Sequence, residues 1–145
     1  MARDVLSLGQ VRIHSGGATR EEAMKEAADI LESVGSVTSS YFDAMQQREM
    51  TVSTYMGNEL AIPHGTNETK AAILESGLSV VRYDGGVDWG GEPVTFVIGI
   101  AGKGDEHLDI LSQIAILFSD DDEVDKLKAA TTPEELYELV SATGV

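Results

Sequence analysis

An apolar run from Val94 to Ala101 constrains the fold of this chain more than any other feature. The run is too short for a helix of a bundle and is rich in β-branched residues, which is typical of a central strand buried on both faces. Such a strand needs other layers above and below it. At 145 residues the chain is long enough to bury a core of this kind in one domain, without disulfides or metal.

Five segments carry the signals of helices that can cover such a sheet. Thr19–Glu22 forms a capping box, and apolar residues recur after it at helical spacing until Gly35. Thr132–Pro133 opens the last helix, with proline at the first helical position. The other helices are expected from Thr38 or Ser39 to Arg48, from Asp105 through Phe118 and from Asp120 through Ala130, and a short helical turn is expected over Asn67 to Ile73.

The remaining apolar runs predict the other strands of a mixed sheet. These strands are expected at Val11–His14, Leu60–Ile62, Leu78–Tyr83 and Val87–Trp89. Asp84–Gly86 consists of turn residues, so Val87–Trp89 is expected to pair back antiparallel onto the strand before it. Helices and strands interleave without strict βαβ alternation, which favours a mixed sheet with helices packed on both faces.

The charge of the chain argues against nucleic acid as a partner. The net charge is −15, with only ten lysines and arginines, whereas a nucleic-acid binder concentrates these residues to neutralise phosphates. An acidic surface favours a basic protein partner, through the encounter rate more than through affinity. The apolar runs are far shorter than a bilayer span, and Met1–Asp4 does not begin a secretory signal, so we expect a cytoplasmic chain without membrane insertion.

The strand expected at Leu60–Ile62 ends abruptly at a histidine. Pro63 cannot donate to a ladder and stops the strand, and Gly65 lets the backbone turn away after His64. An imidazole at such a sheet edge can be a nucleophile, a general base or a metal ligand. The residues alone also allow a strand-end histidine that is satisfied by a backbone carbonyl.

A second histidine follows the central strand. Gly102–His107 links that strand to a helix with Asp105 at its N-cap, and functional loops often lie at the carboxyl ends of sheet strands. His107 falls in the first helical turn, where a surface histidine is the ordinary case. Arg48 falls at the end of its expected helix, a position that cations favour for structural reasons alone.

A metal site is an alternative that these residues leave open. His64 and His107 with Asp105 or Glu106 form a possible zinc ligand set for a hydrolase, although no paired ligand spacing is present. The acidic run Asp120–Glu123 lacks the glycine and the spaced ligands of a calcium loop. It is better explained as the N-cap and first turn of a helix, where negative charge is stabilising.

Two segments together carry a family resemblance. Arg48–Thr66, which contains the Ile-Pro-His-Gly run, and Gly102–Leu108 resemble the active-site segments of the IIA component of the bacterial phosphoenolpyruvate-dependent sugar phosphotransferase system. Within the mannitol and fructose group the likeness is greatest to the mannitol type. The resemblance spans nearly the whole chain. It implies a single domain over residues 1–145 of the α/β class, with a mixed, mainly parallel sheet of about five strands and helices on both faces.

The resemblance also implies roles for three residues and two partners. His64 matches the histidine that accepts a phosphoryl group from the carrier protein HPr and passes it to a cysteine of a IIB domain of the mannitol permease. Arg48 matches an arginine beside that histidine, and His107 matches a histidine that faces it. The family implies neither cofactor nor metal. This chain has no cysteine, so the accepting cysteine belongs to another chain.

Details of the site remain open in the sequence. A phosphoryl-accepting ring needs one nitrogen held by a hydrogen bond, and we expect a backbone carbonyl near Gly65–Thr66 to hold that of His64. Ile62, Met56 and Leu108 are the expected apolar rim. Glu59 departs from the small residue of many relatives, so its carboxylate either repels an incoming phosphate or points away. Similar domains also serve as phosphorylation-sensitive regulatory modules that bind other proteins, which is the alternative function.

Overall fold

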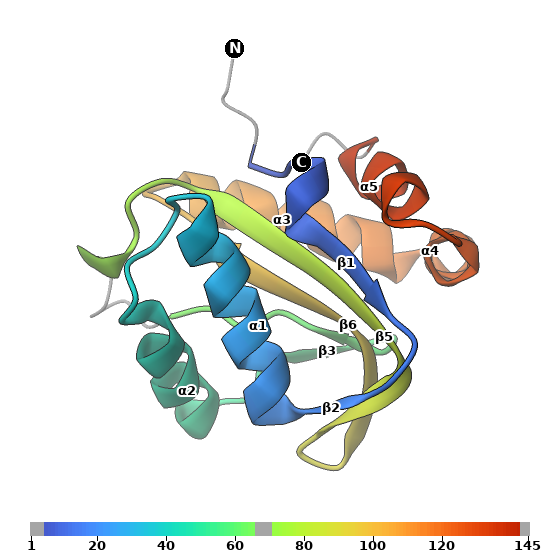
Figure 1. The fold of residues 1–145 in the computed structure, drawn as a ribbon, viewed down its shortest axis with the longest axis horizontal. Helices are drawn as coiled ribbons and strands as arrows, with labels where there is room; N and C mark the ends of the chain where they lie inside the picture. Colours follow the sequence, from blue (N-terminus) through green and yellow to red (C-terminus); the bar gives the residue numbers. More distant parts are fainter. Residues whose placement is uncertain (1–4, 66–70, 143–145) are drawn as a thin grey trace.

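The computed structural model describes residues 5–65 and 71–142. Within these residues, helices and strands alternate irregularly along the chain (Figure 1). The predicted turn over Asn67 to Ile73 lies mostly outside the described residues. The elements are η1 (Leu8–Gln10), β1 (Val11–His14), β2 (Ala18–Thr19), α1 (Arg20–Ser33), α2 (Tyr41–Thr51), β3 (Tyr55–Gly57), β4 (Leu60–Ala61), β5 (Gly77–Trp89), β6 (Glu92–Ala101), α3 (Glu106–Ser119), α4 (Asp121–Ala129) and α5 (Pro133–Ser141).

The strands form one mixed sheet in the order β1-β5-β6-β4-β3, with β2 also paired to β5. β1 and β2 run parallel to β5, and β4 runs parallel to β6. The long β5–β6 ladder and the short β3–β4 ladder are antiparallel. The predicted fold class is therefore confirmed, and the run Val94–Ala101 lies in β6, inside the sheet.

Helices cover both faces of this sheet, as the central strand requires. Residues of α1 and α2 pack with Val97 of β6 in one buried cluster, and residues of α3, α4 and α5 pack with Phe96 and Ile98 in another. Figure 1 shows the same division, with α1 and α2 in front of the sheet and α3 behind it. Alternate residues of β6 thus face opposite cores, because side chains of a strand alternate between its faces.

The predicted hairpin at Asp84–Gly86 is wrong. β5 continues through these residues to Trp89, and Val87–Trp89 pairs with the start of β6 rather than with Leu78–Tyr83. The chain reverses at Gly90–Gly91, where both φ angles are positive. Gly85 serves a close approach instead, because its N–H donates to the carbonyl of Gly16 at 3.1 Å and a Cβ there would lie 2.4 Å from the Gly17 nitrogen.

The helix starts follow the predicted caps in most cases. Thr19 and Glu22 form the reciprocal capping box of α1, at 3.1 and 2.9 Å. The side chain of Asp120 accepts from two backbone N–H groups of α4, and that of Thr132 accepts from one of α5. Asp105 stands at the N-cap of α3, but its side chain makes no capping hydrogen bond.

A buried arginine joins the sheet to the helices of the second cluster. Arg82 of β5 is 5% exposed, and its Nη1 donates to the carbonyls of Leu127, Lys128 and Ala130 at the end of α4. Its Nε donates to Asp84 at 2.8 Å. Because the last carbonyls of a helix lack intrahelical partners, this guanidinium acts as the C-terminal cap of α4.

Candidate functional site

The backbone around His64 is held from both sides. β4 ends at Ala61, one residue before the predicted end of the strand. The N–H of Ile62 donates to Thr54 at 3.1 Å, and Pro63 accepts from the N–H of Ile100 in β6 at 3.0 Å. These two bonds anchor the segment to the residue before β3 and to the carboxyl end of the central strand. His64 therefore leaves the sheet at the edge that the sequence predicted.

A backbone carbonyl two residues earlier in the sequence holds the ring of His64 in place. Its Nδ1 lies 2.7 Å from the carbonyl oxygen of Ile62. Since a carbonyl oxygen only accepts, Nδ1 carries the proton and the lone pair is on Nε2. A backbone carbonyl was expected in this role, but its predicted place near Gly65–Thr66 is wrong. The chain bends at Pro63, which brings the ring back over the residue two positions earlier.

The surroundings of His64 favour its neutral form. Burial lowers the pKa of its imidazole below the ordinary value, the hydrogen bond to Ile62 raises it in part, and the nearby His107 and Arg48 lower it further. The carboxylate of Glu49 acts in the opposite direction. A neutral ring with a fixed Nδ1–H offers its Nε2 lone pair as a nucleophile near pH 7.

His107 lies against His64, as predicted. Their ring centroids are 5.3 Å apart, and the ring planes are tilted by 55°. His107 belongs to the first turn of α3, and Gly102 packs directly beneath it, because a Cβ on Gly102 would lie 2.3 Å from the Cα of His107. The loop between them is tied down where the N–H of Lys103 donates to Ser76 at 2.9 Å.

Arg48 completes the predicted group from the last turn of α2. Its Nη1 donates to the carbonyl of Val52 at 2.5 Å, which closes the end of the helix. Its charge also lies near enough to depress the pKa of His64. A guanidinium has five N–H donors, so the bond to Val52 leaves donors of Arg48 for other acceptors.

Two buried side chains of the site were not predicted. Glu49 is 9% exposed and accepts from the N–H and hydroxyl of Thr54 and from the indole of Trp89. Tyr41 is 1% exposed, and its hydroxyl joins backbone atoms that lie 24 and 59 residues further along the chain. Only the place of Glu49 beside Arg48 gave a signal in the sequence, whereas contacts as distant as those of Tyr41 give none.

Known proteins resemble this chain in sequence and in fold. The family described as "Phosphoenolpyruvate-dependent sugar phosphotransferase system, EIIA 2" matches residues 4–143. The chain belongs to this family. A mannitol-specific phosphotransferase enzyme IIA component of Halalkalibacterium halodurans is 46% identical over 136 residues, which cover 94% of this chain and 94% of that protein. The resemblance found in the sequence, including that to the mannitol type, is confirmed.

Solved structures agree with this assignment. The complex of enzyme IIA for mannitol with its phosphorylated enzyme IIB from Escherichia coli contains a chain that matches at a TM-score of 0.83 and 31% identity, over 92% of this chain and 95% of that one. The nitrogen regulatory protein IIA-Ntr of Neisseria meningitidis matches at 0.81 and 24% identity, over 94% of this chain and 96% of that one. The second likeness extends to the fold alone.

The carboxylate of Glu59 in this EIIA chain points away from the histidines. It accepts from the hydroxyl of Thr95 at 2.6 Å and pairs with Lys128, whose hydrogen bond lowers the pKa of the carboxyl. Glu59 lies beside Thr95 on β6, whereas Pro63 lies beside Ile100. Five residues of extended strand, about 16 Å, separate these two levels. Of the two alternatives for Glu59, repulsion of a phosphate at the histidines is therefore excluded.

The apolar rim of this EIIA site differs from the prediction in one residue. Ile62 is buried at 5% exposure, because it packs into the core beneath the sheet. Met56 and Leu108 are exposed, and Met50 and Val52 beside Arg48 add two further exposed apolar side chains. Exposed apolar side chains of this kind can be covered by a partner protein.

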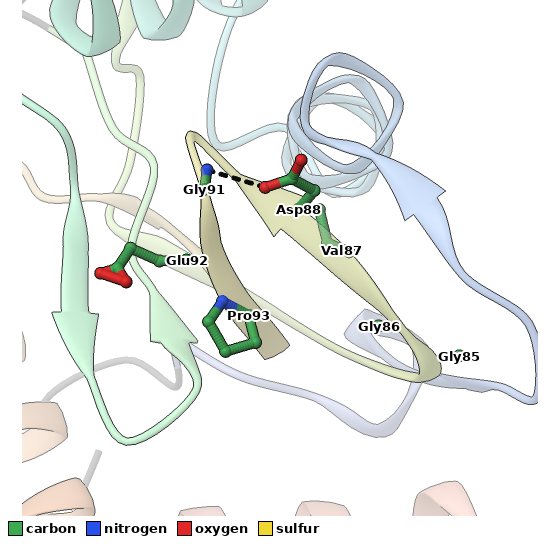
Figure 2. A pocket seen from close by; sticks show the side chains of 7 residues that line it. All are labelled: Gly85, Gly86, Val87, Asp88, Gly91, Glu92 and Pro93. Carbon is green, nitrogen blue, oxygen red and sulfur yellow. Dashed lines mark hydrogen bonds between the residues drawn. The ribbon is translucent and has the colours of Figure 1, made fainter.

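A hollow of the surface lies apart from the histidines. Figure 2 shows the hollow at the Gly90–Gly91 reversal, where the carboxylate of Asp88 accepts from the N–H of Gly91 at 2.7 Å. It contains no histidine. Within residues 5–65 and 71–142, no group of three or more His, Cys, Asp and Glu is placed to hold a metal ion. No helix in this part of the chain is long and apolar enough to cross a membrane.

Proposed function

We propose that this chain is a phosphoryl carrier that accepts a phosphoryl group from HPr on His64 and passes it to a cysteine of a IIB component for mannitol uptake. One observation carries the proposal. The carbonyl of Ile62 fixes the proton of His64 on Nδ1, which leaves Nε2 as a neutral nucleophile beside His107. Membership of the EIIA family supplies the context in which such a nucleophile has a donor and an acceptor.

The forward step forms one bond and breaks one. The lone pair of Nε2 attacks the phosphorus, and the bond between phosphorus and the donor atom of HPr breaks, so that its electron pair returns to the donor. Phosphoryl transfer asks the protein mainly for positioning and for stabilisation of the three equatorial oxygens. Arg48 and His107 provide N–H donors for these oxygens, and the first turn of α3 adds its positive end.

The second step reverses the first with a different partner. A thiolate of the IIB component attacks the phosphorus, and the electron pair of the N–P bond returns to Nε2. The accepting cysteine must come from another chain, because this one has none. The exposed Met56 and Leu108 offer apolar contacts to each partner in turn. The structure of a relative solved with its phosphorylated enzyme IIB supports the choice of acceptor.

The sugar itself does not take part at this site. Mannitol is proposed because mannitol-specific enzyme IIA components are 46% and 49% identical to this chain. A chain that receives its phosphoryl group from HPr would work in the cytoplasm. A regulatory module would also accept a phosphoryl group on a histidine. Onward transfer therefore separates a transport component from the regulatory alternative.

Intact mass spectrometry tests the proposal with matched variants. Incubation with phosphoenolpyruvate, enzyme I and HPr should add one acid-labile phosphoryl group to the wild type and to His14→Ala, and none to His64→Ala. His14 is the control because it lies on β1 and pairs with Glu26, away from the other histidines. Addition of the IIB component should then remove the group. Absence of the adduct from the wild type, with active HPr confirmed, would refute the carrier role.

A further inference from the structure

The hydroxyl of Tyr41 lies between the two segments that carry the histidines. Tyr41 is the first residue of α2 and is 1% exposed. Its hydroxyl donates to the carbonyl of Ile100 at 2.7 Å and accepts from the N–H of Gly65 at 3.0 Å. One oxygen atom therefore joins the residue after His64 to the end of β6.

The bond to Ile100 extends this link toward His107. Ile100 lies two residues before Gly102, the glycine against which the backbone of His107 packs. The N–H of Ile100 also donates to Pro63, directly before His64. The carbonyl and the N–H of one residue thus connect both histidine segments, and Tyr41 contributes its side chain to this link.

We propose that Tyr41 is a positioning residue that sets the placement of His64 relative to His107 for phosphoryl transfer. The inference rests on the proposed function, and it assigns Tyr41 no contact with the phosphoryl group. Misplacement of a reacting group by about 1 Å can cost about 100-fold in rate, so a clamp of this kind matters for a carrier that works mainly by positioning.

The chemistry of the hydroxyl suits a permanent clamp. A tyrosine hydroxyl has one proton, which is committed to Ile100, and an oxygen lone pair that Gly65 uses. Burial raises the pKa of Tyr41 to about 12, so the hydroxyl keeps its proton throughout the range in which cells operate. Phenylalanine would preserve the ring in the core but would leave a carbonyl and an N–H without this partner.

Tyr83 provides a matched control within the same buried cluster. It is 3% exposed, and its hydroxyl donates to the carboxylate of Glu26. That bond contacts neither His64 nor His107, and the ring of Tyr83 stacks instead near His14. Tyr41→Phe and Tyr83→Phe therefore remove the same atom from the same core, but only the first change loosens the histidine segments.

The kinetic test compares the two variants as acceptors from phosphorylated HPr. Tyr41→Phe should lower the maximal transfer rate by at least about tenfold, while the KM for phosphorylated HPr stays within about twofold, because the docking surface is untouched. Tyr83→Phe should retain the wild-type rate. Equal rates in the two variants would overturn the proposal.

An NMR test is independent of transfer and therefore of the proposed function. In Tyr41→Phe the amide proton of Gly65 should exchange faster and the nitrogen shifts of His64 should change, whereas Tyr83→Phe should alter neither. In the wild type the hydroxyl proton of Tyr41 should give a cross-peak to the amide of Gly65, which decides the matter even if the variant does not fold. Absence of this cross-peak, or unchanged spectra in a folded Tyr41→Phe, would overturn the clamp.

Discussion

Gly102→Ala should disturb the site without contacting the ring of His64 or that of His107. An ideal Cβ on Gly102 would lie 2.3 Å from the Cα, 2.5 Å from the Cβ and 2.9 Å from the nitrogen of His107. Ordinary contact begins at 3.4 Å, so the backbone of His107 must retreat by about 1 Å. All three atoms belong to or adjoin the main chain, which cannot move aside as the end of a flexible side chain can.

Two magnitudes follow from this displacement. Overpacking of this kind costs about 1–3 kcal/mol of unfolding free energy. A shift of about 1 Å at a positioned group costs about 100-fold in rate, which corresponds to about 2.7 kcal/mol. We therefore expect the transfer rate from phosphorylated HPr to fall between about tenfold and 100-fold, with His64 still able to accept the group. Rapid-quench kinetics and urea denaturation measure the two effects.

Two glycines separate this effect from general destabilisation. Gly99→Ala would bring a Cβ to 2.5 Å from Ser79 and 2.8 Å from Ala27, so it should cost similar stability in the core while leaving His107 in place. Gly16→Ala meets nothing within 4 Å and should change neither quantity. If Gly102→Ala transfers phosphoryl groups at the rate of Gly99→Ala, the close packing of Gly102 on His107 does not support the site.

Three further changes test other parts of the structure. The lowered pKa of His64 keeps its ring neutral below the ordinary value of 6.5, so the transfer rate should stay level from pH 8 down through pH 6.5 and decline only below it; an inflection above 6.5 would contradict this assignment. Glu49→Gln removes a charge that raises the pKa of His64, so an NMR titration should show a further fall in that pKa, and no change would mean that the carboxylate is electrostatically silent. Arg82→Met leaves three carbonyls at the end of α4 without their cap and should cost about 2–4 kcal/mol of unfolding free energy, while transfer persists. Loss of phosphoryl transfer in a folded Arg82→Met variant would contradict the assignment of Arg82 to stability alone.

The sequence predicted those parts of the fold that depend on neighbours in the chain. The capping box of α1, the buried β6 and the strand that ends shortly before Pro63 each arise from local patterns, and all three are present. At α5 Thr132 caps the helix as predicted, but the side chain of Glu135 bonds to Thr131. The hairpin at Asp84–Gly86 failed because Gly85 meets a partner far away in the sequence, the backbone of Gly16. A glycine needed for close approach and a glycine needed for a turn look alike in a sequence.

The residues of the candidate site likewise fall into those that the sequence predicted and those that it did not. His64, His107 and Arg48 were predicted from their residue types and their likeness to a family, and the structure brings the rings of the two histidines to 5.3 Å between centroids. Tyr41 and Glu49 were missed because each acts through main-chain or side-chain atoms of distant segments. Buried residues that position a site have no sequence motif of their own, so they are recognised only from their contacts in the structure.

The length of β6 separates the Gly90–Gly91 reversal from the histidine segments, so the reversal can be modified. The strand runs from Glu92 at the Gly90–Gly91 reversal to Ala101, next to the histidine segments, so its two ends lie about 30 Å apart. A peptide tag, a fluorophore or a surface tether placed in that reversal would stand clear of incoming partners. The protein can therefore be immobilised or labelled at this reversal while the histidine segments stay accessible.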